Sequence, residues 1–127
     1  MATWDDVRRV VAALPEVAER TSRGCLQWSV RDRLVAWERP LGRTDLAELG
    51  DAAPDGPLLG VRVRDEGAKR ALVAAQPDVY LTTSHFDGYP AVLVQLDRVP
   101  LDELRELLVE AWLDRAPARL RTAYLSG

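Results

Sequence analysis

Residues 26–39 read LQWSVRDRLVAWER. In the first half of this stretch, Leu26, Trp28 and Val30 alternate with polar residues, which is the pattern of a strand with one buried face. A polar Arg-Asp-Arg segment then interrupts the pattern, and a second apolar stretch follows at residues 34–39. The two stretches therefore predict a β-hairpin, and with it an antiparallel sheet.

Apolar residues at helical spacing predict one helix near each end of the chain. Trp4, Val7, Val11 and Leu14 fall on one face, and Pro15 should end that first helix. Near the C-terminus, a second apolar stripe consists of Leu101, Leu104, Leu107, Leu108, Ala111 and Trp112. The core expected from these patterns contains Trp4, Val7, Leu72, Leu104, Leu108 and Trp112.

The remaining elements follow from shorter patterns. We expect a loop with a short helical turn at 41–57, a strand at 58–64, a helix at 65–75, a short strand at 79–81, a polar loop at 82–90, a strand at 91–96 and a final helix opened by Pro117. Whether a further strand forms near residues 17–21 is left open. The order, roughly α-β-β-β-α-β-β-α-α, indicates an α+β fold, which we expect to form one domain over residues 1–127.

The charge balance argues against strong binding to nucleic acids. The chain has 17 basic and 20 acidic residues, a net charge of −3 and a pI near 5.2. Dedicated nucleic-acid binders are usually basic, because phosphate contacts supply most of their affinity. Basic residues nevertheless gather locally, since residues 20–43 contain six arginines and two acids.

Several site classes are disfavoured by composition. A single cysteine, Cys25, allows no intrachain disulfide and no cysteine-based metal site, and the single histidine has no companion ligand motif. We therefore expect no metal and no cofactor. The N-terminus lacks the features of a signal peptide, and no apolar run approaches the ~18 residues of a membrane helix. A cytoplasmic location without membrane contact is the expectation.

From the middle of the chain onward, a series of weak signals follows one another in a characteristic order. They are Gly60–Val63, Pro77–Tyr80, His85–Pro90, Val92–Asp97, Leu101–Leu108 and the pair Ala111-Trp112, together with Leu34–Trp37 and Leu14-Pro15 near the start. This series resembles the MmcQ/YjbR family. It covers nearly the whole chain without one sharp motif. It implies a frataxin-like (CyaY-like) fold, with a twisted antiparallel sheet and helices packed on one side, and DNA binding through projecting hairpins in a double-wing arrangement.

One segment departs from the pattern of that family. Members often carry a Lys-His-Trp cluster where this chain has Ser84-His85-Phe86. A role that depends on the missing lysine and tryptophan is therefore not carried over to this chain.

The candidate DNA-binding residues lie on or next to the predicted strands. They are Arg31, Arg33, Arg39, Arg62 and Arg64, whose planar guanidinium groups match phosphate geometry, and Trp37, whose ring could stack on a base. The competing interpretation is that these arginines lie on a solvated strand face and that Trp37 belongs to the core. If the protein binds DNA, we expect weak, non-specific and salt-dependent binding.

The alternative function is a non-catalytic module that binds a small molecule or a protein. Its expected pocket is lined by Trp37, His85 and Tyr89, with the loop at 82–90 as one wall. No catalytic residues are predicted, because Ser84 next to His85 in sequence does not place a nucleophile against a base. The acids Asp102, Glu103, Glu106 and Glu110 on the C-terminal helix are interpreted as a solvated face rather than a metal site.

Overall fold

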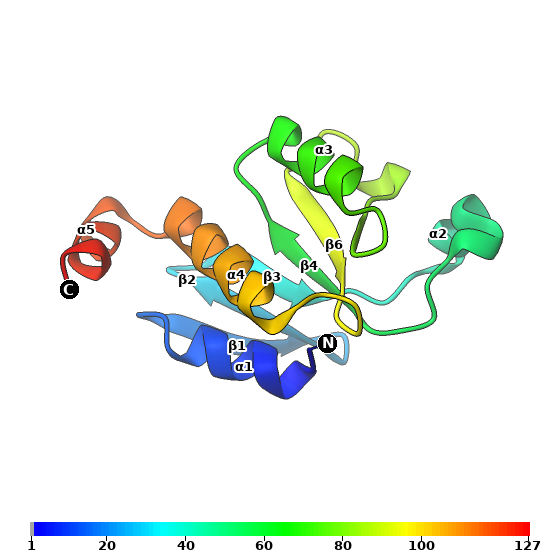
Figure 1. Ribbon diagram of the computed structural model, residues 1–127. Coiled ribbons are helices and arrows are strands. Elements are labelled where there is room, and N and C mark those ends of the chain that lie inside the picture. Colours follow the sequence, from blue (N-terminus) through cyan, green and yellow to red (C-terminus); the bar gives the residue numbers. More distant parts are fainter. Residues whose placement is uncertain (1) are drawn as a thin grey trace.

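A six-stranded antiparallel sheet forms the centre of the computed structural model, which describes residues 2–127 (Figure 1). Residue 1 of the expected domain lies outside this range. The strand order is β1-β2-β3-β4-β6-β5. The strands are β1 (Val17–Ser22), β2 (Cys25–Val30), β3 (Arg33–Glu38), β4 (Leu58–Arg62), β5 (Tyr80–Leu81) and β6 (Ala91–Gln95). The predicted α+β fold is confirmed.

The helices accompany the sheet at both ends of the chain and between strands. They are α1 (Trp4–Ala12), α2 (Arg43–Leu49), α3 (Glu66–Ala75), α4 (Leu101–Arg115) and α5 (Ala118–Ser126), with the short 3-10 helices η1 (Gly50–Ala52) and η2 (Ser84–Phe86). Thr3 and Asp6 form a reciprocal capping box that starts α1, and the Asp65 carboxylate caps α3 by accepting from Ala68 N–H at 2.8 Å. No helix within residues 2–127 combines the length and apolarity needed to cross a bilayer.

The structure adds one strand and one full helix to the predicted order. The first addition, β1, pairs with β2 along its whole length, but five of its six residues are exposed. It therefore lacks the apolar alternation that marks a strand in sequence. The second addition, α2, is a complete helix where the sequence predicted a helical turn. The acid Asp45 starts it by accepting from Gly42 N–H at 2.9 Å.

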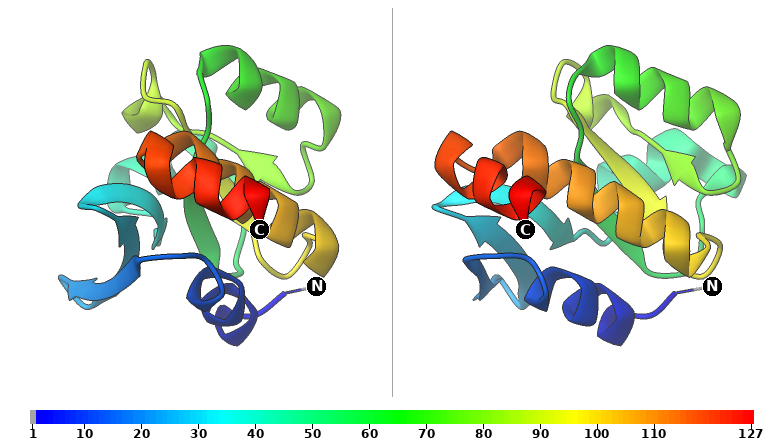
Figure 2. Two further views of the ribbon diagram at one scale, coloured as in Figure 1. Left: turned by 90° about the vertical axis from the view of Figure 1, so that its left-hand side faces the viewer. Right: turned by 60° about the vertical axis from the view of Figure 1, so that its left-hand side comes forward.

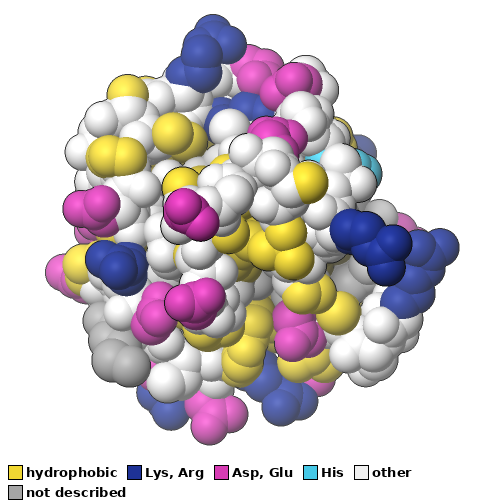
Figure 3. Space-filling model, turned by 90° about the vertical axis from the view of Figure 1, so that its right-hand side faces the viewer, with side chains coloured by type: hydrophobic (Ala, Val, Ile, Leu, Met, Phe, Trp, Pro, Cys, Tyr) yellow, Lys and Arg dark blue, Asp and Glu magenta, His cyan; other side chains and the backbone are white. Residues whose placement is uncertain are grey.

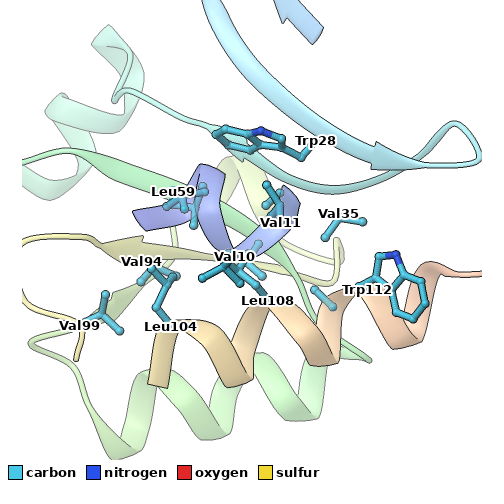
Figure 4. Close-up of a cluster of buried hydrophobic side chains, with 14 of the residues drawn as sticks. Val10, Val11, Trp28, Val35, Leu59, Val94, Val99, Leu104, Leu108 and Trp112 are labelled. Atoms are coloured by element: carbon cyan, nitrogen blue, oxygen red, sulfur yellow. The ribbon is translucent and has the colours of Figure 1, made fainter. Parts of the chain in front are cut away.

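The main core lies between one face of the sheet and the helices α1 and α4 (Figure 4). Val7, Leu104, Leu108 and Trp112 are fully buried there, as predicted, while Trp4 and Leu72 pack against the same core less deeply, as do Ala68 and Val73 of α3. Figure 2 shows these helices on the same side of the sheet. Burying each large apolar side chain contributes on the order of 1.5–3 kcal/mol, so this layer supplies most of the hydrophobic stabilisation of the fold.

The sheet also buries part of its second face. A smaller cluster contains Trp37, Leu58, Phe86, Ala91 and Leu93, with Leu34, Leu41 and Leu81 packed against it. The sequence predicted no helix over this face of the sheet, and in the structure the loop at 82–90 covers it. This loop carries the aromatic residues that the sequence singled out.

Candidate functional site

Trp37 is the centre of the second sheet face. Its ring lies 6.3 Å from the Phe86 ring and 6.5 Å from the Tyr89 ring, centroid to centroid. Trp37 and Phe86 are only 9% and 5% exposed, whereas Tyr89 is 37% exposed. The exposed His85 ring contacts the edge of Phe86 at 5.1 Å. The structure thus brings together all three residues of the predicted pocket, but Phe86 fills the space between their rings.

The only lysine of the chain holds this loop in place from one side. Lys69, on α3, is 3% exposed, and its ammonium group donates to Phe86 O at 2.7 Å and to Tyr89 O at 2.8 Å. It also forms an ion pair with Glu66 Oε1 at 2.8 Å. These three partners satisfy a buried charge that would otherwise be costly, so they fix the backbone on which Phe86 and Tyr89 stand.

Helix α2 holds the same loop from the other side. The Glu48 carboxylate accepts from Ser84 N–H at 3.0 Å and from Ser84 Oγ at 2.5 Å. Nearby, the buried Asp45 pairs with Arg39 at 3.0 Å, and the Arg39 guanidinium lies 5.2 Å from the Phe86 ring centroid. Burial alone would raise the pKa of Asp45, but hydrogen bonds from Gly42 and Arg39 outweigh burial and lower that pKa.

Three arginines converge where the C-terminal end of α4 meets one end of the central strands β3 and β4, and we call Arg33, Arg62 and Arg115 the arginine cluster. Arg33 Nη1 donates to Arg115 O at 3.3 Å, and Arg115 Nε donates to Leu34 O at 3.1 Å. Arg62 Nε donates to Pro90 O at 3.1 Å. Burial, followed by the positive charges of Arg62 and Arg33, lowers the pKa of Arg115, so Arg115 lies within electrostatic reach of both other arginines.

The arginine cluster lacks the carboxylate partners that neutralise other arginines. None of its members forms an ion pair with an Asp or Glu of residues 2–127. Instead, their hydrogen bonds go to backbone carbonyls, and Arg62 also donates to Tyr89 Oη at 3.3 Å and stacks 4.7 Å from the Tyr89 ring centroid. The remaining N–H donors of these guanidinium groups are available to an anion.

The other arginine candidates lie in different surroundings. Arg31, at the β2–β3 turn, is paired with Glu16 at 2.6 Å. Arg39 is mostly buried against Asp45. Arg64 is exposed and lines a groove between α3 and α4. Only Arg33 and Arg62 of the predicted set therefore belong to the arginine cluster.

Sequence reasoning missed Arg115, which is 81 residues away from its hydrogen-bond partner Leu34. No local pattern relates the end of one helix to the start of a distant strand.

The acids on α4 were expected to form a solvated face. Three of them, Glu103, Glu106 and Glu110, instead line the groove between α3 and α4. No group of three or more His, Cys, Asp or Glu within the described part of the chain has the arrangement of a metal site.

Charge is unevenly distributed over the surface. On the face shown in Figure 3, hydrophobic side chains gather in the middle, acidic side chains lie mainly to their left, and a group of basic side chains occupies the right edge near the histidine. A protein with a net negative charge can thus still present local positive surfaces.

The sequence model of the YjbR family matches residues 12–113. The chain belongs to the YjbR family. This confirms the family predicted from the sequence, and the match includes Arg33, Arg62 and Tyr89, while Arg115 lies just beyond its end.

Known relatives match this chain over nearly its full length. The chain is 51% identical over 130 residues to the uncharacterized protein Rv2570 of Mycobacterium tuberculosis (strain ATCC 25618 / H37Rv) and equally to the uncharacterized protein Mb2600 of Mycobacterium bovis, covering 100% of this chain and 98% of each relative. It also resembles the crystal structure of the Deinococcus radiodurans protein DR2400, a DUF419 domain, with a TM-score of 0.67 and 28% identity over 89% of this chain and 78% of that one.

Proposed function

We propose that this YjbR-family protein binds DNA weakly and without sequence preference through its arginine cluster. The observation that supports the proposal is the convergence of Arg33, Arg62 and Arg115 without a carboxylate partner. A guanidinium group has five N–H donors, and the backbone contacts use only some of them. Phosphate oxygens match the remaining donors in geometry and charge.

Tyr89 extends this surface. Its ring is 37% exposed and is held in position by Arg62 on one side and by the Trp37 edge contact on the other. An exposed, immobilised ring next to phosphate-binding cations is suited to stacking on a base or sugar. Trp37, the predicted stacking residue, is mostly buried and supports Tyr89 from below.

The negative charges of the protein limit the affinity. The whole chain has a net charge of −3, and the acids along α4 repel a polyanion. Phosphate contacts also carry no information on base sequence. The proposed role is therefore non-specific binding without catalysis, in the cytoplasm, where DNA is accessible.

A salt titration tests this proposal. The affinity for two unrelated fluorescein-labelled duplexes is measured by fluorescence anisotropy over a range of salt concentrations. We expect equal affinities for both duplexes and a log–log salt slope of roughly −2 to −4, because about three phosphate contacts release about three counterions. Tight binding to only one duplex at physiological salt would contradict the proposal.

A second candidate is a small planar ligand at the same surface. The observation that favours it is the row of rings formed by His85, Phe86 and Tyr89, in which the two outer rings are exposed. A complete absence of DNA binding at low salt would favour this candidate over DNA.

A further inference from the structure

A groove with a cavity volume of about 660 Å³ lies between α3 and α4. The two helices run side by side in opposite directions, because Gln76, at the end of α3, donates to Glu103, in the first turn of α4, at 2.9 Å (Figure 2). Apolar side chains from both helices line it, namely Ala68, Ala71, Leu72, Leu107 and Ala111. The lining also includes two arginines, Arg62 and Arg64, but its five acids outnumber them, so the groove carries a net negative charge. A volume of this size lies within the range of ligand and peptide sites.

The α4 side of the groove is a continuous row of carboxylates. Glu103, Glu106, Glu110 and Asp114 line it, at intervals of three or four residues that place them on one helix face. None of these four forms an ion pair with a basic residue of the described chain. Acids elsewhere, such as Glu16, are neutralised by arginine.

Hydrogen bonds fix the orientation of Glu103, the first carboxylate of this row. Its Oε2 accepts from the buried Tyr80 hydroxyl at 2.5 Å and from Gln76 at 2.9 Å. No side chain or backbone N–H of residues 2–127 donates to its Oε1. The carboxylate is thus held in one orientation, with one oxygen free to accept from a cationic group entering the groove. The desolvated Tyr80 and its bond to Glu103 raise the pKa of Tyr80, so this donor stays protonated.

We propose that the α3–α4 groove binds a basic amphipathic helix of a partner protein. The apolar floor matches the apolar face of such a helix, and the carboxylate row matches arginine or lysine at the same three- and four-residue spacing. From Glu103 to Asp114 the row is about 16 Å long at the helical rise, which is about three turns of a partner helix. Small residues on the α3 side, Ala68 and Ala71, permit close approach of a third helix.

The test uses a synthetic probe. A fluorescein-labelled helical peptide with leucine on one face and arginine on the flanking positions is titrated with the full-length protein, next to a matched peptide with glutamate in place of arginine. The arginine peptide should bind and the glutamate peptide should not. Glu106→Gln combined with Glu110→Gln should weaken binding about five- to tenfold, the effect of losing two exposed ion pairs.

Matched variants distinguish binding in the groove from a non-specific effect of the protein's negative charge. Asp5→Asn combined with Asp51→Asn removes the same charge outside the groove and should change the affinity less than about twofold. Ala71→Tyr places a ring in the groove at an exposed position and should abolish binding. Ala75→Tyr, also exposed on α3 but outside the groove, should not.

Two results would overturn the groove proposal. One is equal binding, or no binding, of the two peptides. The other is equal behaviour of the two tyrosine variants, which would show that the peptide binds elsewhere. Arg62 of the arginine cluster also lines the groove, but none of these variants changes Arg62, so the groove and the DNA proposals are tested by different substitutions.

Discussion

The indole ring of Trp37 lies directly against Gly60 of the neighbouring strand. Trp37 and Gly60 are paired in the β3–β4 register, and a Cβ at position 60 would lie 2.5 Å from Trp37 Cε2. Real Cβ contacts are never this close, so only glycine leaves room for the ring. The absent side chain on β4 therefore allows Trp37 to lie flat and to support Phe86 and Tyr89 from below.

Gly60→Ala should destabilise the protein by about 1–3 kcal/mol, the usual cost of overpacking. The added methyl group would push the Trp37 ring toward the loop at 82–90. Urea unfolding measures the loss. In a Trp37→Leu background the same substitution should cost less, because the clashing ring is gone; equal costs in both backgrounds would show that Trp37 is not the residue displaced.

Lys69→Met should destabilise the protein by about 2–4 kcal/mol. The substitution keeps the length of the side chain but leaves Phe86 O, Tyr89 O and Glu66 without their buried donor. Hydrogen exchange should also rise in the 82–90 loop. The adjacent Arg70 is exposed, so Arg70→Met should cost less than about 0.5 kcal/mol. Similar losses for both variants would contradict the role of Lys69.

Asp45→Asn should remove a pH-dependent part of the stability. The folded pKa of Asp45 is lowered, so its ionised form stabilises the fold above the ordinary value of 3.8, and this contribution is lost as the pH falls through the folded pKa. At about pH 7 the unfolding free energy of the variant should be about 2–4 kcal/mol lower than that of the wild type, because Arg39 keeps its charge without a partner.

The pH dependence provides the check. Between about pH 5 and pH 2, the unfolding free energy of the wild type should fall more steeply than that of Asp45→Asn. Asp51→Asn, at an exposed position, serves as control and should follow the wild type. Parallel curves for the wild type and Asp45→Asn would show that Asp45 does not titrate with folding.

Sequence patterns predicted the elements that bury a regular apolar face. Trp28 lies in phase with Val30, and both are buried in the main core, as the hairpin pattern indicates. Strand β1 could not be predicted in the same way, because its stability comes from pairing with β2 and from contacts such as Glu19 with Arg8 and with Trp28 Nε1. These partners are polar or lie nine to eleven residues away, so they leave no apolar alternation in the sequence of β1.

The candidate site was predictable only in part, for the same physical reason. The sequence singled out Trp37, Arg62 and Tyr89, which the structure brings together. Whether an arginine is neutralised depends on its spatial neighbours. Arg31 meets Glu16 across two strands, whereas Arg115 meets Arg33 across the whole fold, and neither relation leaves a signal in local sequence.

The arginine cluster can be tested by removing its charges while retaining hydrogen-bonding amides. Arg33→Gln, Arg62→Gln and Arg115→Gln are combined in one variant. Its control combines Arg8→Gln, Arg20→Gln and Arg31→Gln, which removes the same charge from arginines that are already paired with Glu19, Asp32 and Glu16. Circular dichroism and urea unfolding first establish that both variants are folded.

The most direct measurement is the salt dependence of DNA binding for the wild type and these two variants, by fluorescence anisotropy on one duplex. If the arginine cluster binds phosphate, its variant should lose at least about tenfold in affinity at low salt and most of the salt slope, by about one unit for each arginine. The control variant should keep a slope close to that of the wild type. Equal losses in both variants, or an unchanged slope in the cluster variant, would contradict DNA binding through Arg33, Arg62 and Arg115.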